Sequence, residues 1–292
     1  MVNNVSQSAA TQSIHRLEKV FETMLVDRTK RPFVLTTEGK LCYDTFREIL
    51  ELYDTVAVRV KTMHDQVSGQ IRIAAIYSVG LHDMSRCMRD FMKTFPKVKV
   101  RLEFQHPHKV YQSVMNSEVD LGIISYPAAS PEIDIVPLWN ERMVLACPVD
   151  HPLAEAKEGI MLEQMRDVDY IAFDRDLMIR KECDRAFRHH GVAVNIAMEF
   201  DNIETIKQAV ETGLGVSILP APTVRREVED GRIVAIPLLK PMFRPIGIIH
   251  RHRKVFTPTA RKFMEMLTEI VPHGNQTAVE KQDTPPTAGF AE

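Results

Sequence analysis

After residue 69, strands and helices alternate along the chain, and this alternation limits the fold more than any other feature of the sequence. A first series is expected as strand 70–76, helix 81–95, strand 97–104, helix 110–116 and strand 119–125, with further strands at 133–138 and 143–149. A second series is expected as strand 170–173, helix 177–189, strand 194–200, helix 203–211 and strand 216–219, then strands 233–238 and 245–250 and helix 257–270. Such alternation predicts parallel sheets whose faces are covered by helices. We therefore expect an α/β fold with two lobes, a crossover near residues 147–152, and a ligand-binding cleft between the lobes.

The composition is that of a soluble globular protein and excludes several other classes. Hydrophobic residues make up 45% and charged residues 26% of the 292 residues, and a chain of this length can form two or three domains. The longest apolar runs are far shorter than a membrane span, and residues 1–7 lack the features of a secretory signal. The 4 cysteines form no CxxC pair, which favours reduced thiols in a cytosolic protein. The net charge of -2 excludes a wholly basic coat protein but not a local DNA-binding surface.

Residues 6–22 are predicted to form an amphipathic helix. Ser6 suits the N-cap position, where its hydroxyl accepts a hydrogen bond from a free backbone amide. Apolar residues recur at spacings of three or four, which predicts one apolar face: Ala9, Ala10, Ile14, Leu17 and Phe21. The opposite face is rich in uncharged donors and acceptors, which suit base edges in a major groove. An ordinary solvated surface would show the same pattern, so the helix alone leaves both interpretations open.

The following residues are predicted to form a short hairpin and one long helix. Arg28, Lys30 and Arg31 lie beside a run of β-branched and aromatic residues, which is the pattern of a wing, and a new helix starts at Thr36 or Thr37. From residue 40 to about 67, apolar residues alternate spacings of four and three: Phe46, Leu50, Tyr53, Ala57, Val60, His64 and Val67. Such a narrow seam favours pairing with a second copy of the chain. Packing of the helix on its own domain is the alternative.

Signatures of enzymes and metal sites are absent from the sequence. There is no GxSxG, HExxH, P-loop or GxGxxG-then-acid pattern. The histidines at 106 and 108, 189 and 190, and 250 and 252 lie too close together or lack matching Cys or carboxylate ligands, which favours surface histidines. We expect no catalysis, no metal and no cofactor.

Residues at strand ends identify the expected binding cleft. Ser78 follows the first strand and precedes a helix, whose free amides would favour an anion such as a carboxylate or sulfate. In the second lobe, Asp201 with Glu204 opens a helix, although simple capping explains that pair without a ligand. The expected lining residues are Tyr77, Ser78, Val79, Ser125, Tyr126, Phe173, Asn202 and Thr205.

Six stretches, taken in order, resemble landmarks of the LysR-type transcriptional regulators. Residues 6–18 (SQSAATQSIHRLE) are similar to the recognition-helix signature, and residues 25–39, with LVDR, Arg31 and LTTEG, are similar to the wing and the start of the linker helix. The stretches GQIRI (69–73), FPKV (95–98), DLGI (120–123) and TGLGVSILP (212–220) are similar to landmarks of the sensor domain. Together they span about residues 5 to 270.

The resemblance implies a cytoplasmic, effector-responsive regulator that binds double-stranded DNA as a homodimer or homotetramer and admits RNA polymerase as a further partner. It implies a partial winged helix-turn-helix at 1–39, a dimerising linker helix at 40–68, a two-lobed effector-binding domain at 69–271 and a disordered tail at 272–292. The first lobe is expected at about 69–147 and 244–271, and the second at about 148–243. The expected DNA-binding residues are Ser6, Gln7, Ser8, Thr11, Gln12, Arg16, Arg28 and Arg31, with the arginines of the wing on phosphates.

Departures from the family pattern leave alternatives open. Ser8 replaces a usual proline, Gln12 stands where a basic residue is common, and Glu22 replaces a usual glycine, so no operator preference carries over. The family has two further helices before the recognition helix, which predicts either a true start upstream of Met1, the interpretation we favour, or a truncated DNA-binding unit. A two-lobed solute-binding protein is the alternative function, and a truncated sensor that no longer binds DNA is a third.

Overall fold

The computed structural model describes residues 6–62, 67–80 and 83–269, and the chain divides into two compact units, Met1–Gln66 and Val67–Glu292. The tail expected at 272–292, residues 63–66 of the expected linker helix and residues 81–82 of the expected helix 81–95 lie outside the described residues. The first unit combines helices with a small hairpin, and the second unit is α/β.

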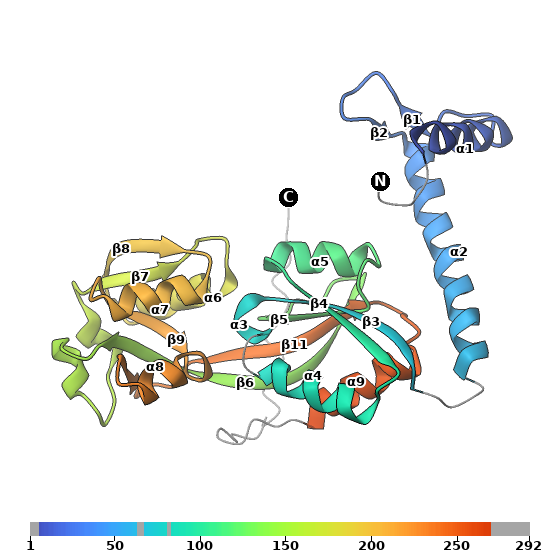
Figure 1. The fold of residues 1–292 in the computed structure, drawn as a ribbon. Coiled ribbons are helices and arrows are strands. Elements are labelled where there is room, and N and C mark those ends of the chain that lie inside the picture. Colours follow the sequence, from blue (N-terminus) through green and yellow to red (C-terminus); the bar gives the residue numbers. More distant parts are fainter. Residues whose placement is uncertain (1–5, 63–66, 81–82, 270–292) are drawn as a thin grey trace. The chain divides into compact units, whose positions relative to one another are not determined.

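The first unit has the elements that its sequence predicts (Figure 1). They are α1 (Gln7–Val20), β1 (Val26–Asp27), β2 (Val34–Leu35) and α2 (Thr37–Thr62). Ser6 caps α1, because its hydroxyl oxygen accepts a hydrogen bond from the backbone N–H of Ala9 at 3.2 Å. The strands β1 and β2 pair antiparallel as the expected hairpin.

Gly39 lies where α2 passes closest to the start of the hairpin. A Cβ at this position would lie 1.9 Å from the carbonyl oxygen of Leu25, so a side chain has no room. Thr36 stabilises the same contact, since its hydroxyl donates to the carbonyl oxygen of Met24 at 2.7 Å and accepts from the backbone N–H of Gly39 at 2.9 Å. Close backbone packing therefore requires glycine here. The position near a helix start explains only why glycine is tolerated.

The first lobe of the second unit is a sheet covered on both faces. The strand β3 pairs parallel with β4 and with β5, as predicted. The helix α5 covers one face, and α4 and α9 cover the other (Figure 1). The bounds are β3 Gly69–Ala75, α3 Tyr77–Gly80, α4 Asp83–Thr94, β4 Val98–Phe104, α5 Pro107–Met115, β5 Leu121–Ser125, β11 Phe243–Arg251 and α9 Pro258–Glu269.

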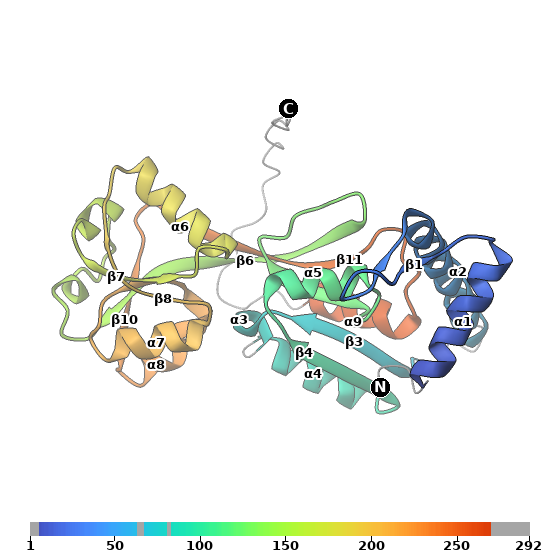
Figure 2. The ribbon, with the colours of Figure 1, turned by 90° about the horizontal axis from the view of Figure 1, so that it is seen from above.

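The two strands expected at 133–138 and 143–149 are one long strand, β6 (Ile133–Pro148). Its first half pairs antiparallel with β11 in the first lobe, and its second half pairs antiparallel with β9 and β10 in the second lobe. The sheets are therefore mixed, because β6 adds antiparallel pairs to the parallel pairs that the alternation predicts. The chain passes between the lobes along β6 and β11, which lie side by side (Figures 1 and 2).

The second lobe combines a parallel pair of strands with the antiparallel end of β6. The strands β7 and β8 pair parallel, and an isolated bridge from Tyr170 to Val216 joins this pair to the segment that leads into β9. The bounds are β7 Asp169–Phe173, α6 Met178–His189, β8 Asn195–Phe200, α7 Ile203–Glu211, β9 Ser217–Pro220, α8 Arg225–Glu229 and β10 Ile233–Pro237, with 3-10 helices at Pro152–Glu155, Leu162–Met165 and Ala221–Val224. The sequence patterns did not predict α8, the 3-10 helices or the first-lobe helix α3, and Ser78 lies inside α3 rather than before a helix.

Two hydrophobic cores correspond to the two lobes. Ile133, at the start of β6, belongs to the first-lobe core, whereas Met143 to Cys147 belong to the second-lobe core. The transition between the cores therefore falls within β6, before the crossover that the sequence indicated at 147–152.

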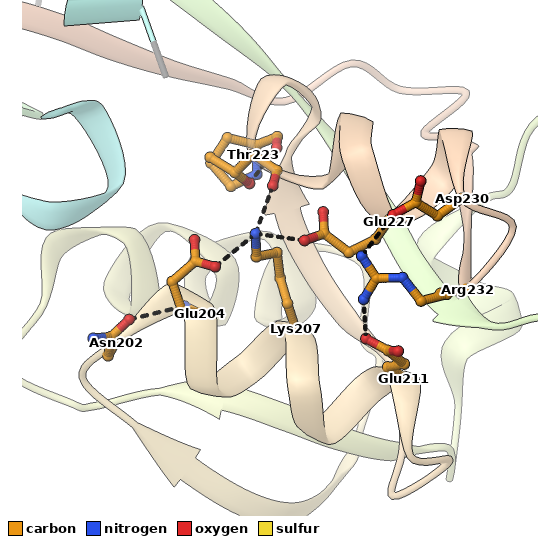
Figure 3. Close-up of polar contacts among 9 residues, drawn as sticks. Asn202, Glu204, Lys207, Glu211, Thr223, Glu227, Asp230 and Arg232 are labelled. Carbon is orange, nitrogen blue, oxygen red and sulfur yellow. Dashed lines mark hydrogen bonds and ion pairs between the residues drawn. The ribbon is translucent and has the colours of Figure 1, made fainter. Parts of the chain in front are cut away.

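A buried lysine on α7 connects this helix to α8 and to the 3-10 helix that precedes α8. The ammonium of Lys207 donates to the carbonyl oxygen of Thr223 at 3.0 Å and to the carboxylate of Glu227 at 2.9 Å, and it lies 2.8 Å from the carboxylate of Glu204 (Figure 3). Burial without such partners would be costly for a charged group. The contacts fix the direction of α7, and with it the position of Asn202, the residue that begins this helix.

Candidate functional site

A pocket of about 690 Å³ lies between the two lobes of the second unit. From the first lobe it is lined by the ends of β3 and β5 and by the connection from β4 to α5; from the second lobe, by the connections from β7 to α6 and from β8 to α7. The pocket thus lies at the strand ends where the sequence placed the cleft. The predicted residues that line it are Tyr77, Ser78, Ser125, Tyr126, Phe173 and Asn202.

Two predicted residues do not line the pocket. Val79 is 2% exposed and belongs to the first-lobe core, because it lies on the inner side of the short helix α3. Thr205 is half-buried within the first turns of α7 and is not among the residues around the pocket. The capping expectation also needs a correction, because Asn202 and not Asp201 caps α7, with its side-chain oxygen accepting from the backbone N–H of Glu204 at 2.8 Å.

Sequence reasoning did not predict that the β4–α5 and β7–α6 connections line the pocket, nor that Arg244 of β11 does. The structure adds Gln105, His106, Pro107, His108 and Tyr111 from the first lobe, Asp176, Leu177, Met178 and Ile179 from the second, and Arg244 from β11. The rule that selected Ser78, a strand end followed by a helix start, applies equally to the connections after β4 and β7. Arg244 carries no such signal, because its role depends on a partner far away in the sequence.

Hydrogen-bond donors from both lobes surround the pocket. The helices α5 and α6 begin there without a side-chain cap, so the amides of their first turns lack that partner. Within the described residues, the hydroxyl of Ser125 has no hydrogen-bond partner. The side-chain oxygen of Asn202 caps α7, which leaves its NH₂ group available to donate to a ligand. Such groups can hold an anion without a net positive charge.

The side chain of Ser78 contacts a buried ion pair formed by Arg244 and Glu141. The guanidinium of Arg244 donates to the Ser78 hydroxyl oxygen at 2.9 Å, which leaves the hydroxyl proton available to a ligand. The same guanidinium donates to the carboxylate of Glu141 from Nε at 2.8 Å and also from a second nitrogen. Arg244 and Glu141 are 2% and 4% exposed, so both charges are withdrawn from water.

Two further contacts connect the lobes across the pocket. The Nε2 atom of His106, at the start of α5, lies 3.3 Å from a carboxylate oxygen of Asp176, which precedes α6. Tyr126 has a φ of 50° and packs against the second-lobe core, although it follows β5 of the first lobe. Burial raises the pKa of its phenol far above the ordinary value of 10.0, so the ring presents a neutral hydroxyl.

The predicted DNA-facing residues of α1 and its N-cap are all exposed, although exposed residues also occur elsewhere around this helix. Exposed side chains are Ser6, Gln7, Ser8, Thr11, Gln12 and Arg16. Arg31 of the wing is exposed as well and has no hydrogen bond or ion pair within the described residues. These groups are therefore accessible to a ligand as large as a DNA duplex.

Arg28 differs from Arg31 because it is engaged within the unit. Its guanidinium donates to the carboxylate of Glu18 at 3.1 Å and lies 3.2 Å from a ring nitrogen of His15. Burial raises the pKa of the Glu18 carboxyl, but backbone hydrogen bonds from Leu25 and Val26 and the nearby Arg28 charge outweigh it, and the pKa is lowered overall. Arg28 thus ties the wing to α1.

Apolar side chains remain exposed on both helices of the first unit. Phe21 of the α1 face is 46% exposed, and its ring contacts that of Phe46 on α2 with centroids 6.1 Å apart. On α2, Leu50 and Tyr53 are 62% and 71% exposed. The side chains of Ala57, Val60 and His64, which the seam also includes, lie outside the described residues.

Among residues 6–62, 67–80 and 83–269, no group of three or more His, Cys, Asp and Glu side chains could hold a metal ion. No helix within those residues combines the length and the apolar character needed to cross a membrane.

Comparisons with known proteins agree with this arrangement. The family described as bacterial regulatory helix-turn-helix protein, lysR family, matches residues 2–40, and the LysR substrate binding domain matches residues 64–271. YbhD of Escherichia coli (strain K12), an uncharacterized HTH-type transcriptional regulator, is 29% identical over 272 residues, which cover 91% of this chain and 84% of YbhD.

Two solved structures share the fold. Full-length OxyR from Pseudomonas aeruginosa has a TM-score of 0.71 at 22% identity and covers 91% of this chain and 85% of its own. The regulatory domain of CcmR from Synechocystis, in complex with 2-PG, has a TM-score of 0.65 at 23% identity and covers 71% of this chain and 99% of its own.

The order of the two matched domains is the order that the sequence motifs indicated. The LysR substrate binding domain alone spans more than half of the 292 residues, and the helix-turn-helix match before it favours a regulator over a solute-binding protein. The chain belongs to the LysR family of bacterial transcriptional regulators.

Proposed function

We propose that this regulator is controlled by a small anionic metabolite that binds in the pocket between the lobes and changes DNA binding. The observation that carries the proposal is the pocket itself, which has donors on both sides, Ser78 and Ser125 on one lobe and Asn202 on the other. A ligand that contacts both lobes favours one lobe arrangement through its differential contacts. The BenM effector binding domain, a neighbour in fold with a TM-score of 0.60, was solved with its effector benzoate.

The remainder of the pocket suits an apolar ligand body. Tyr77 and Phe173 form walls on opposite lobes, and Ile76, Ile124 and Ile203 add apolar surface. The Tyr77 ring stacks on Phe104 with centroids 5.8 Å apart, which holds the wall in place. The ligand class that fits this lining is a ring or branched apolar group that bears a carboxylate.

The test is a calorimetric titration of benzoate into the native chain and into Ser78→Ala. We expect Ser78→Ala to bind benzoate about ten- to a hundredfold more weakly, since a hydrogen bond to a charged group contributes about 1.5–3 kcal/mol. Ser130→Ala is the matched control, because Ser130 is exposed and outside the pocket. Equal benzoate affinity in the native chain and Ser78→Ala, together with a benzoate effect on DNA binding, would place the ligand site elsewhere.

We further propose that α2 pairs with α2 of a second copy and that the assembly acts on DNA in the cytoplasm. The support is the exposed apolar surface of α2, of which Leu50 and Tyr53 form the centre. Such a stripe is unfavourable in water unless a partner covers it. The exposed residues of α1 and the wing would then meet two half-sites, with Arg31 on phosphate and Gln7, Ser8, Thr11 and Gln12 towards bases.

A further inference from the structure

The pocket has a single strong cation among its described lining residues. Arg244 is the only lysine or arginine that lines it, and it lies on β11, where the chain passes between the lobes. The other charged side chains there are acidic, Asp176 and Asp201, and the two histidines are engaged, His106 with Asp176 and His108 with Gln112. The electrostatic character of the pocket therefore depends on the environment of Arg244.

Glu141 cancels the charge of Arg244. The two residues are direct partners in the register of β6 and β11, and two guanidinium nitrogens donate to the same carboxylate oxygen. The second carboxylate oxygen accepts from the indole N–H of Trp139 at 3.3 Å. The pair is buried, so solvent screens its charges weakly, and removal of either partner would leave the other uncompensated.

We infer that Glu141 determines the charge class of the ligand. This inference rests on the proposed ligand pocket and goes further by naming the residue that limits ligand charge. With Glu141 in place, the floor of the pocket offers an anion the Ser78 hydroxyl and helix amides, but no net positive charge. The pocket then accepts monoanions with an apolar body and discriminates against dianions such as phosphate monoesters, which Asp176 and Asp201 also repel.

The experiment compares three probes that share one ring and differ in charge: benzamide, benzoate and phenyl phosphate. Their affinities are measured by calorimetry on the full chain and on Glu141→Gln. The substitution leaves the charge of Arg244, which lines the pocket, uncompensated, and the interaction of one unit charge with a nearby anion is worth about a factor of ten or more. We expect Glu141→Gln to bind benzoate about tenfold and phenyl phosphate about a hundredfold more tightly, with benzamide unchanged.

Glu227→Gln is the matched control. It removes a buried carboxylate from a lysine, Lys207, in the second-lobe cluster of Figure 3, and neither residue lines the pocket. We expect it to leave the affinity ratios of the three probes unchanged. If Glu141→Gln changes the affinities of all three probes equally, or leaves the affinity for phenyl phosphate unchanged, Glu141 does not determine ligand charge.

A double variant covers the case in which Glu141→Gln does not fold. Glu141→Gln with Arg244→Gln replaces the pair by two neutral amides, which avoids an uncompensated buried charge. We expect the native ranking of benzoate over phenyl phosphate to persist, because the pair and the two amides are both neutral. A large loss of benzoate relative to benzamide in the double variant would show that Arg244 attracts anions in spite of Glu141, and would overturn the inference.

These outcomes are distinguishable from failure of the proposed function. A native chain that binds benzoate with a Ser78-dependent affinity supports the pocket, whatever Glu141 does. A Ser78-independent affinity counts against the pocket, even if the charge of the bound probe matters.

Discussion

At the scale of single residues, the same residue type has different roles in neighbouring positions. Arg28 and Arg31 both belong to the wing, and their sequence context suggested phosphate contacts for both. The structure separates them, because Arg28 is engaged by Glu18 and His15 while Arg31 is exposed without such partners in the described residues. Sequence reasoning had no means to see this, since Glu18 and Arg28 meet only when the hairpin folds onto α1.

Arg31→Ala should weaken binding to every DNA sequence to a similar extent. Loss of one phosphate contact lowers the slope of log affinity against log salt by about one and leaves sequence preference intact. The measurement is fluorescence anisotropy with an operator duplex and an unrelated duplex over a range of salt. Arg28→Ala is the comparison, for which we expect a lower thermal unfolding temperature of the first unit. A change of sequence preference at unchanged affinity in Arg31→Ala would contradict the assignment.

At the scale of elements, local patterns predicted most strands and helices of the second unit but not how strands continue. The strand β6 reads as two because Asn140 and Glu141 interrupt its apolar pattern. Glu141 is tolerated there because Arg244 lies opposite it in β11, 103 positions away. Periodicity reports only local burial, so a buried ion pair between distant strands appears as a break. For the same reason the sequence indicated Ser78 but not the pair beneath it.

Asp120, which precedes β5, provides a test of element packing through pH. Its carboxylate accepts from the backbone N–H of Arg72 at 2.8 Å and from the ammonium of Lys254 at 3.2 Å. Burial raises the pKa of the Asp120 carboxyl, but the Lys254 charge and the Arg72 contacts outweigh it and bring the pKa below its ordinary value of 3.8. A carboxyl whose pKa is lower in the folded than in the unfolded state stabilises the fold at pH values above its unfolded-state pKa. This stabilisation is lost as the pH falls through the folded-state pKa.

We therefore expect Asp120→Asn to lower the free energy of unfolding near neutral pH. The difference in free energy of unfolding between the native chain and Asp120→Asn should become smaller as the solution becomes acidic. The measurement is the free energy of unfolding in urea for the native chain and Asp120→Asn, from pH 6 down to about pH 3. Asp134→Asn, at an exposed contact with His252, is a surface control in which we expect a smaller difference. A constant gap between the native chain and Asp120→Asn at every pH would contradict the role of the charge.

At the scale of the whole molecule, the helix-turn-helix match and the proposed ligand pocket lie in separate compact units, so the proposed regulation requires that one unit affects the other. The lobes of the second unit are joined by β6 and β11, where Glu141, Arg244 and, through Arg244, Ser78 are connected. A ligand on Ser78, as proposed, would therefore bind directly beside the strands that link the lobes. The sequence predicted a change from helical to alternating periodicity near residue 69, because each pattern is local, but it did not indicate this connection.

Assembly is the property of the whole molecule that a substitution can test most directly. Leu50 and Tyr53 are exposed on α2, so their replacement by Glu has little effect on packing within one chain. In a dimer built on α2, the same carboxylates would be buried between two helices, where unpaired charges are costly. We expect Leu50→Glu with Tyr53→Glu to convert the dimer to a monomer in light scattering and to lower DNA affinity, with circular dichroism unchanged.

Lys40→Glu, a charge change at an exposed residue near the start of the same helix, should leave the dimer intact. An unchanged oligomer in the double variant would exclude α2 as the dimer interface, because two buried carboxylates on each helix could not be accommodated there without loss of association.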